Sequence, residues 1–130
     1  MGATILAVDD DECLRELLYL HLSQAGYRVL LAEDAIVAGH FLLDETVDLL
    51  IADIEMPFMD GLDLVRAIRG DARLAPLPVI FLTSQAGHEG AANELGAVAY
   101  LRKPLHLDEL LGAVTKHGHG RAPLSDPTPA

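Results

Sequence analysis

The chain contains little cysteine, little positive charge and no long apolar run. Its single cysteine, Cys13, cannot form an internal disulfide, so a disulfide scaffold and a cysteine-based zinc site are both excluded. No stretch approaches the roughly 18 apolar residues of a membrane span, and the N-terminus lacks the basic and apolar regions of a cleavable leader. These absences predict a cytoplasmic protein without a membrane segment.

Basic residues are scarce, and their distribution is uneven. The 130 residues include 9 Lys and Arg against 20 Asp and Glu, a formal net charge of −11. Residues 1–63 hold 14 acidic and 2 basic side chains (net −12), whereas residues 64–130 hold 6 acidic and 7 basic ones (net +1). Because nucleic-acid backbones and anionic lipids bind clustered Lys and Arg, we expect no direct nucleic-acid binding by this domain and no membrane binding.

The hydrophobic pattern predicts a single α/β domain. Hydrophobic residues make up 51% of the chain, enough for one sizeable core. Apolar runs of strand length recur at residues 4–8, 28–32, 49–52, 79–82 and 98–101. Since these runs are apolar on both faces and alternate with segments of helical period, they predict a doubly wound, five-stranded parallel sheet with five helices.

Capping residues and glycines delimit the predicted helices. Asp11 and Asp34 are expected to cap the first two helices, a third follows Asp60-Gly61 and stops near Gly70, and the last begins around Leu107. The apolar faces predicted for the first two helices comprise Leu14, Leu17, Leu18, His21, Leu22 and Ala25, then Ile36, Val37, His40, Phe41 and Leu43.

The fourth helical segment and the C-terminal tail have the weakest patterns. Residues 85–95 contain Gly87 and Gly90, each of which costs about 1 kcal/mol relative to Ala in a helix, so this helix is expected to be short or distorted. We expect the domain to occupy residues 1–118, and the Pro-rich residues 119–130 to form a disordered tail or linker stub.

Polar side chains follow four of the five predicted strands. Asp9, Asp10 and Asp11 follow the first, Asp53 the third, Thr83 and Ser84 the fourth, and Arg102 and Lys103 the fifth. The carboxyl ends of parallel strands meet at one edge of a sheet, where α/β proteins place their sites. Clustered carboxylates repel one another unless a cation neutralises them, and an all-oxygen site suits Mg²⁺, or Mn²⁺. With Lys103 and Thr83 opposite, the edge would hold a phosphoryl group, and Asp53 would be its nucleophile.

The motifs at these strand ends resemble those of a known family. They read Ile5-Leu6-Ala7-Val8-Asp9-Asp10-Asp11, Asp53-Ile54-Glu55-Met56-Pro57-Phe58-Met59-Asp60-Gly61, Phe81-Leu82-Thr83-Ser84 and Tyr100-Leu101-Arg102-Lys103-Pro104. Over residues 3–117 the chain resembles the receiver domain of bacterial two-component response regulators. The resemblance implies a flavodoxin-like receiver fold with strand order 2-1-3-4-5.

The resemblance also implies a phosphoacceptor site. Asp53 is then expected to accept a phosphoryl group from a phosphohistidine of a sensor histidine kinase or a histidine phosphotransfer protein. Asp10 and Asp53 would ligate Mg²⁺ through their side chains, Asp9 through water, and Glu55 through its backbone carbonyl. The domain would catalyse its own phosphorylation and dephosphorylation without being a turnover enzyme.

A switch in the second half of the chain is implied in the same way. Lys103 would pair with phosphorylated Asp53, and its peptide bond to Pro104 would be cis. Thr83 would move to the phosphoryl group while Tyr100 rotates inward, changing the output face.

Other positions are relevant to the lifetime of the acyl phosphate and to the way the domain passes on its signal. By the same resemblance, Glu55 and Gln85 occupy variable positions that tune the lifetime of the acyl phosphate. A homodimer through the face formed by the fourth helix, fifth strand and fifth helix is a possible output. The run Ala97-Val98-Ala99 lacks the acidic residues that receivers joined to winged-helix DNA-binding domains usually carry there, which disfavours that subclass.

Three alternatives remain open. A receiver-like interaction module could work without phosphate, although the complete set of candidate site residues counts against it. A phosphohydrolase with an aspartate nucleophile would normally have a second Asp two residues later, where this chain has Glu55. A flavodoxin-like cofactor binder would need a phosphate-cradling loop after the first strand, where this chain has three carboxylates.

Overall fold

The computed structural model describes residues 2–118, so the tail expected at 119–130 lies outside the described residues. Strands and helices alternate along the chain. Their bounds are β1 (Thr4–Val8), α1 (Glu12–Gln24), β2 (Arg28–Ala32), α2 (Ala35–Asp44), β3 (Leu49–Asp53), α3 (Gly61–Arg69), β4 (Val79–Thr83), α4 (Glu89–Glu94), β5 (Ala99–Arg102) and α5 (Leu107–His117). Across residues 2–118, none of these helices is long and apolar enough to cross a membrane.

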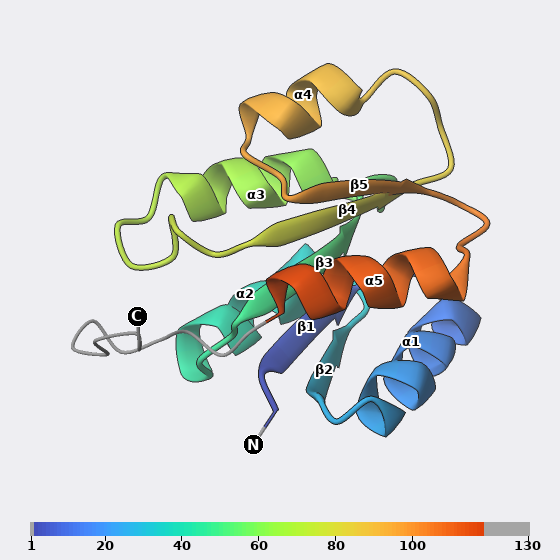
Figure 1. Ribbon diagram of the computed structural model, residues 1–130. Coiled ribbons are helices and arrows are strands. Elements are labelled where there is room, and N and C mark those ends of the chain that lie inside the picture. Colours follow the sequence, from blue (N-terminus) through green and yellow to red (C-terminus); the bar gives the residue numbers. More distant parts are fainter. Residues whose placement is uncertain (1, 119–130) are drawn as a thin grey trace, which may run out of the picture.

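The five strands form one parallel sheet in the order β2-β1-β3-β4-β5, which confirms the predicted fold. Helices α1 and α5 cover one face of the sheet, and α2, α3 and α4 cover the other (Figure 1). Every residue of β1, β3 and β4 is buried, as expected for central strands packed on both faces. The centre of the sheet is therefore a rigid platform for its carboxyl edge.

Three strands end later than their apolar runs predict. β3 continues through Asp53, β4 through Thr83 and β5 through Arg102. The reason is that the backbone pairing, which does not depend on side-chain polarity, continues past the apolar run: Asp53 lies opposite Leu82, and Thr83 opposite Arg102. Asp53 and Thr83 are thus held within the sheet rather than in the loops after it.

The helix faces were predicted only in part. Leu18 and Leu22 of α1 are buried, but Leu17, Ile36 and Leu43 are 42%, 68% and 67% exposed, and His40 and Ala25 are also exposed. Apolar residues surround most of α2, so their spacing does not identify the side that packs against the sheet.

Helix α4 is the shortest helix among the described residues. It spans only Glu89–Glu94 of the predicted 85–95 segment. Gly87 has a φ of 100°, a conformation that favours glycine, and it lies in the loop before the helix. This agrees with the expectation of a short helix at this point.

The Asp60-Gly61 pair joins α3 directly to the end of β3. The Asp60 carboxylate caps α3 by accepting a hydrogen bond from the backbone N–H of Asp63 at 2.8 Å. A Cβ atom on Gly61 would lie 2.3 Å from the carbonyl oxygen of Asp53. Glycine at this position therefore allows the first turn of α3 to pack against the strand end that carries the candidate nucleophile.

We expect Gly61→Ala to lower the free energy of unfolding by about 1–3 kcal/mol, because the backbone around Asp53 must shift to admit the methyl group. The matched control is Gly39→Ala in α2, where a Cβ atom meets nothing within 4 Å. That change should raise stability by about 0.5–1 kcal/mol, since alanine favours the helix. Urea unfolding of both variants measures the difference, and a Gly61 variant as stable as the wild type would contradict the steric account.

Candidate functional site

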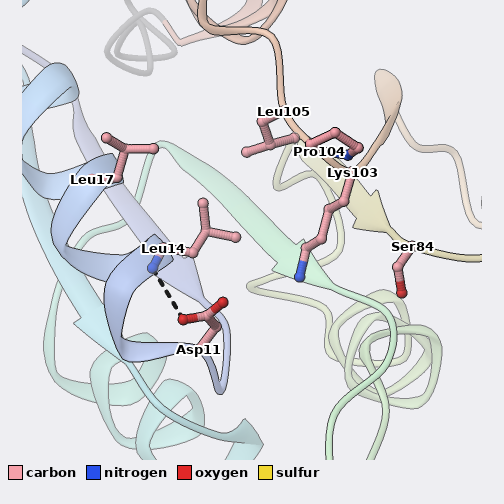
Figure 2. Close-up of a pocket in the computed structure, with 7 residues that line it drawn as sticks. All are labelled: Asp11, Leu14, Leu17, Ser84, Lys103, Pro104 and Leu105. Carbon is pink, nitrogen blue, oxygen red and sulfur yellow. Dashed lines mark hydrogen bonds between the residues drawn. The ribbon is translucent and has the colours of Figure 1, made fainter.

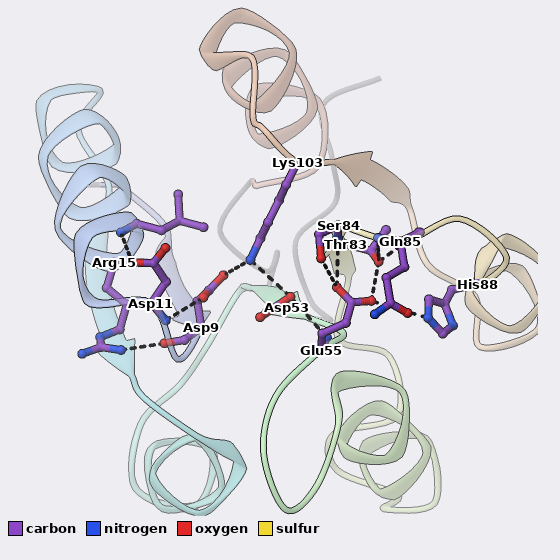
Figure 3. A network of polar contacts seen from close by, with 11 residues as sticks. Asp9, Asp11, Arg15, Asp53, Glu55, Thr83, Ser84, Gln85, His88 and Lys103 are labelled. Atoms are coloured by element: carbon purple, nitrogen blue, oxygen red, sulfur yellow. Dashed lines mark hydrogen bonds and ion pairs between the residues drawn. The ribbon is translucent and has the colours of Figure 1, made fainter.

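The ends of β1, β3, β4 and β5 converge at one edge of the sheet and bring together polar side chains from distant parts of the sequence (Figure 3). Asp9 and Asp53 come from adjacent strands and are both buried. Lys103 reaches them from the end of β5. The predicted convergence is therefore present.

The acidic cluster comprises Asp9, Asp10 and Asp53. One ligand atom from each lies within 4.8 Å of the other two, and Asp10 is exposed at the mouth of the cluster. Three carboxylate oxygens at this separation fit a hard divalent cation, with space on the exposed side for further ligands. The residues present therefore fit the predicted metal site.

Lys103 partly compensates the charge of the cluster. Its Nζ lies 2.9 Å from Oδ2 of Asp9 and 3.3 Å from Oδ1 of Asp53. Burial lowers the pKa of Lys103, but the hydrogen bond and charge of Asp9, together with Asp53, outweigh burial and raise the pKa above its ordinary value. The peptide bond between Lys103 and Pro104 is cis, in agreement with the expectation.

Asp53 has the most perturbed carboxyl group among those described. Burial, followed by the negative charge of Asp9, raises its pKa from 3.8 to about 7, although Lys103 acts in the opposite direction. The remaining repulsion is what a bound cation would relieve, because positive charge favours the ionised carboxylate.

Further contacts hold the backbone around the acidic cluster, and the sequence indicated only the Asp11 cap among them. Oδ1 of Asp9 accepts a hydrogen bond from the backbone N–H of Asp11 at 2.9 Å, and Asp11 in turn caps α1. Arg15 donates to the backbone carbonyl of Asp9 at 2.7 Å. The Arg15 contact was missed because it satisfies a backbone group, for which the side-chain pattern gives no signal.

A second group of contacts surrounds the Glu55 carboxylate, beside the acidic cluster. Oε2 accepts a hydrogen bond from the Thr83 hydroxyl and lies 3.5 Å from Nε2 of His88. Oε1 accepts from the backbone N–H of Ser84 at 2.9 Å and from its hydroxyl at 3.2 Å. Burial raises the pKa of Glu55, but the hydrogen bonds from Thr83 and Ser84 and the adjacent His88 outweigh burial and lower it overall.

Thr83 therefore lies with Glu55 through its hydroxyl and with Lys103 through its backbone, where its carbonyl accepts a hydrogen bond from the Lys103 N–H at 2.8 Å. The Thr83 hydroxyl also accepts a hydrogen bond from the backbone N–H of Gln85 at 3.1 Å, and the Tyr100 hydroxyl lies 3.5 Å from the Gln85 carbonyl. His88 was missed by the sequence reasoning. Its signal was its position five residues after Thr83, directly before α4.

An open groove of about 540 Å³ adjoins the site between α1 and the connection from β5 to α5 (Figure 2). Its polar end carries Asp11, Ser84 and Lys103. Apolar side chains line the remainder, namely Leu14, Leu17, Pro104 and Leu105. A protein surface placed in this groove would lie beside the acidic cluster.

We expect the pKa of Asp53 to make stability depend on pH. Because this pKa is higher in the folded state, the folded protein retains a proton between pH 3.8 and about 7 that the unfolded chain releases, so the contribution of Asp53 to stability falls as pH rises through this range. The free energy of unfolding of Asp53→Asn, taken relative to that of wild type, should therefore rise by about 2–3 kcal/mol between about pH 5 and about pH 8.

The measurement is urea unfolding in chelator-containing buffer at both pH values. Asp44→Asn is the control, because Asp44 is exposed at the end of α2. The difference in free energy of unfolding between this variant and wild type should be the same at both pH values. A constant difference between Asp53→Asn and wild type would contradict the raised pKa.

Comparison with known proteins agrees with this geometry. The sequence profile of the response regulator receiver domain matches residues 5–115. Response regulator MprA of Mycobacterium tuberculosis is 39% identical over 111 residues, which are 85% of this chain and 48% of MprA. Transcriptional regulatory protein GltR of Pseudomonas aeruginosa is 40% identical over 115 residues, 87% of this chain and 48% of GltR. The chain thus spans about half the length of these relatives, and the expectation against a winged-helix output stays a prediction.

Solved structures share the fold. Chemotaxis protein CheY4 of Vibrio cholerae superimposes with a TM-score of 0.84 at 29% identity, over 90% of this chain and 99% of CheY4. A receiver protein of Pseudomonas putida has a TM-score of 0.84 at 34% identity, over 89% and 98%. Response regulator TrrA of Thermotoga maritima, solved in complex with Mg²⁺ and BeF, has a TM-score of 0.79 at 33% identity, over 88% and 97%. From the profile match, these likenesses and the site geometry, the chain belongs to the family of response regulator receiver domains of two-component systems.

Proposed function

We propose that this domain is a phosphoacceptor switch, in which Asp53 takes a phosphoryl group from a phosphohistidine of a sensor histidine kinase or a histidine phosphotransfer protein. The observation that carries the proposal is the buried Asp53 carboxylate, held in β3 beside Asp9 and within 3.3 Å of the Lys103 ammonium. A nucleophile and a cation are thus held side by side at the sheet edge, so that Lys103 would lie next to a phosphoryl group carried by Asp53.

The proposed transfer exchanges one bond for another. An ionised oxygen of Asp53 attacks phosphorus and the bond from phosphorus to the imidazole nitrogen breaks. The donor histidine is protonated on its other ring nitrogen, so it leaves with the bonding electrons as neutral imidazole. Lys103 then neutralises part of the negative charge on the phosphoryl oxygens. Hydrolysis of the acyl phosphate regenerates the Asp53 carboxylate, and in this proposal the phosphorylated state is itself the signal, so the domain is a switch and not a turnover enzyme.

The metal dependence of the reaction is part of the proposal. Asp10 and Asp53 would hold Mg²⁺, or Mn²⁺, through their side chains, with Asp9 acting through water and Glu55 through its backbone carbonyl. When bound, the ion supplies positive charge that favours the ionised form of Asp53 and stabilises the transferring phosphoryl group. The close spacing of the three aspartates supports this assignment, as does the Mg²⁺ and BeF complex named for TrrA.

The surroundings of the site also support a protein as the phosphoryl donor. The groove beside Lys103 is open to solvent, and its apolar part includes the 42% exposed Leu17. A helix of a kinase or phosphotransfer protein lying in this groove would bring its phosphohistidine to the acidic cluster while burying exposed apolar surface. Output through a homodimer, formed by the face of α4, β5 and α5, is part of the same proposal.

Incubation with acetyl phosphate and Mg²⁺ tests the proposal without the cognate kinase. Intact mass measurement should show one phosphoryl adduct on wild type and none on Asp53→Asn, because the amide is not a nucleophile for phosphorus. Asp44→Asn, at the far end of α2, should be labelled like wild type. Loss of the adduct on adding a chelator would establish the metal requirement. The absence of an adduct on wild type, or its presence on Asp53→Asn, would overturn the proposed function.

A further inference from the structure

The Glu55 carboxylate accepts hydrogen bonds from the end of β4 and from the start of the loop that leads to α4. Its two oxygens accept one hydrogen bond from Thr83, the last residue of β4, and two from Ser84, the first residue of the loop (Figure 3). Glu55 itself follows β3, two residues after Asp53. The carboxylate therefore ties the loop after β4 to the loop after β3.

The Thr83 hydroxyl cannot serve two acceptors with its one proton. In this structure the acceptors within reach of the hydroxyl are Oε2 of Glu55, which is the nearer, and the Gln85 carbonyl at 3.1 Å, whereas the proposed switch requires Thr83 to donate to a phosphoryl group on Asp53. A charge-assisted hydrogen bond to a carboxylate is about twice as strong as one between neutral groups. Glu55 and the phosphoryl group therefore compete for the same donor.

His88 connects this competition to α4. It stands at the N-terminus of α4 but makes no capping hydrogen bond, and its Nε2 instead lies 3.5 Å from Oε2 of Glu55. Both side chains are mostly shielded, with 29% of His88 and 23% of Glu55 exposed. Because Ala92 is the one buried residue of α4, the helix has few other contacts that would fix its N-terminal end.

We propose that Glu55 is an internal competitor of the phosphoryl group, which holds Thr83 and Ser84 in the unphosphorylated arrangement and fixes the start of α4 through His88. This inference rests on the proposed function, and it assigns Glu55 a positioning role at the same site. Phosphorylation of Asp53 would draw Thr83 away, leaving the Glu55 carboxylate with fewer partners and loosening its hold on the loop and on α4. Because binding linkage is reciprocal, weakening the Glu55 contacts must strengthen binding of a phosphoryl mimic.

A second explanation must be separated from this one, because the negative charge of Glu55 could oppose an anionic group without any competition for Thr83. Two variants distinguish them. Glu55→Gln removes the charge and weakens the acceptor, whereas Glu55→Asp keeps the charge and withdraws the oxygens by about 1.5 Å, the length of one carbon–carbon bond. Competition predicts tighter binding in both variants, and charge repulsion predicts it only in Glu55→Gln.

The first measurement is a fluorine NMR titration of beryllium fluoride with Mg²⁺. We expect Glu55→Gln and Glu55→Asp each to bind roughly tenfold more tightly than wild type, within the usual range of coupling between sites. Glu94→Gln is the matched control, since it removes a glutamate charge at the exposed end of α4, and its affinity should equal that of wild type. Unchanged affinity in both Glu55 variants, or a gain in Glu55→Gln alone, would overturn the competition.

The second measurement is hydrogen exchange of residues 84–95 without beryllium fluoride. Exchange should be about fivefold faster than in wild type in both Glu55 variants and in His88→Ala, because each loses a hydrogen bond or an ion pair. Exchange in Glu94→Gln should equal that of wild type. If exchange is equal in wild type and the Glu55 variants, the proposed restraint of the loop by Glu55 is overturned. If exchange is equal in wild type and His88→Ala, the proposed extension of this restraint to α4 is overturned. Should wild type bind no beryllium fluoride, the proposed function fails, while exchange still decides the restraint.

Discussion

Two buried carboxylates and one ammonium group determine the properties of this domain. Asp9 and Asp53 follow adjacent strands in register, because Val8 pairs with Ala52, so the sheet itself holds them close together. Lys103 contacts both, and two negative charges against one positive charge leave the buried pair under-compensated. A proton, a cation or a phosphoryl group with its cation resolves this imbalance. Each of these alternatives changes which groups Asp53 and Lys103 attract.

The sheet tolerates this imbalance because β1 and β3 are buried along their whole length and, apart from Thr4 and Asp53, are apolar. β1, β3 and β4 contribute fully buried residues to packed layers on both faces. Movement of Asp53 away from Asp9 would require these strands to shift within a close-packed interior. The strands therefore do not relieve the repulsion between Asp9 and Asp53 by moving apart. It acts instead on the loops at the sheet edge.

The residues that the sequence predicted well are those whose position follows from the sheet. Asp9, Asp53 and Lys103 could be placed together because parallel strands of similar length end at one edge, and a helix could be placed directly after Asp60-Gly61. Leu17, Ile36 and Leu43 were expected on the apolar helix faces but are exposed, since apolar residues lie on more than one side of their helices. The pairing of Thr83 with Glu55 was equally inaccessible, because it depends on how two loops 28 residues apart approach each other.

The two ends of α4 are held by different means, and this asymmetry decides how a change at Asp53 can reach the surface. At the C-terminal end, Arg69 of α3 donates to the Leu95 carbonyl at 2.7 Å, and the same guanidinium binds the carbonyls of Ala75 and Leu77 at 2.7 and 2.6 Å. Thr83 and Asp53 contribute nothing to those three contacts. At the N-terminal end, Nε2 of His88 lies 3.5 Å from Oε2 of Glu55, which belongs to the site. A rearrangement of Thr83 therefore acts on the start of α4 while its end stays anchored, so the helix would turn about Arg69.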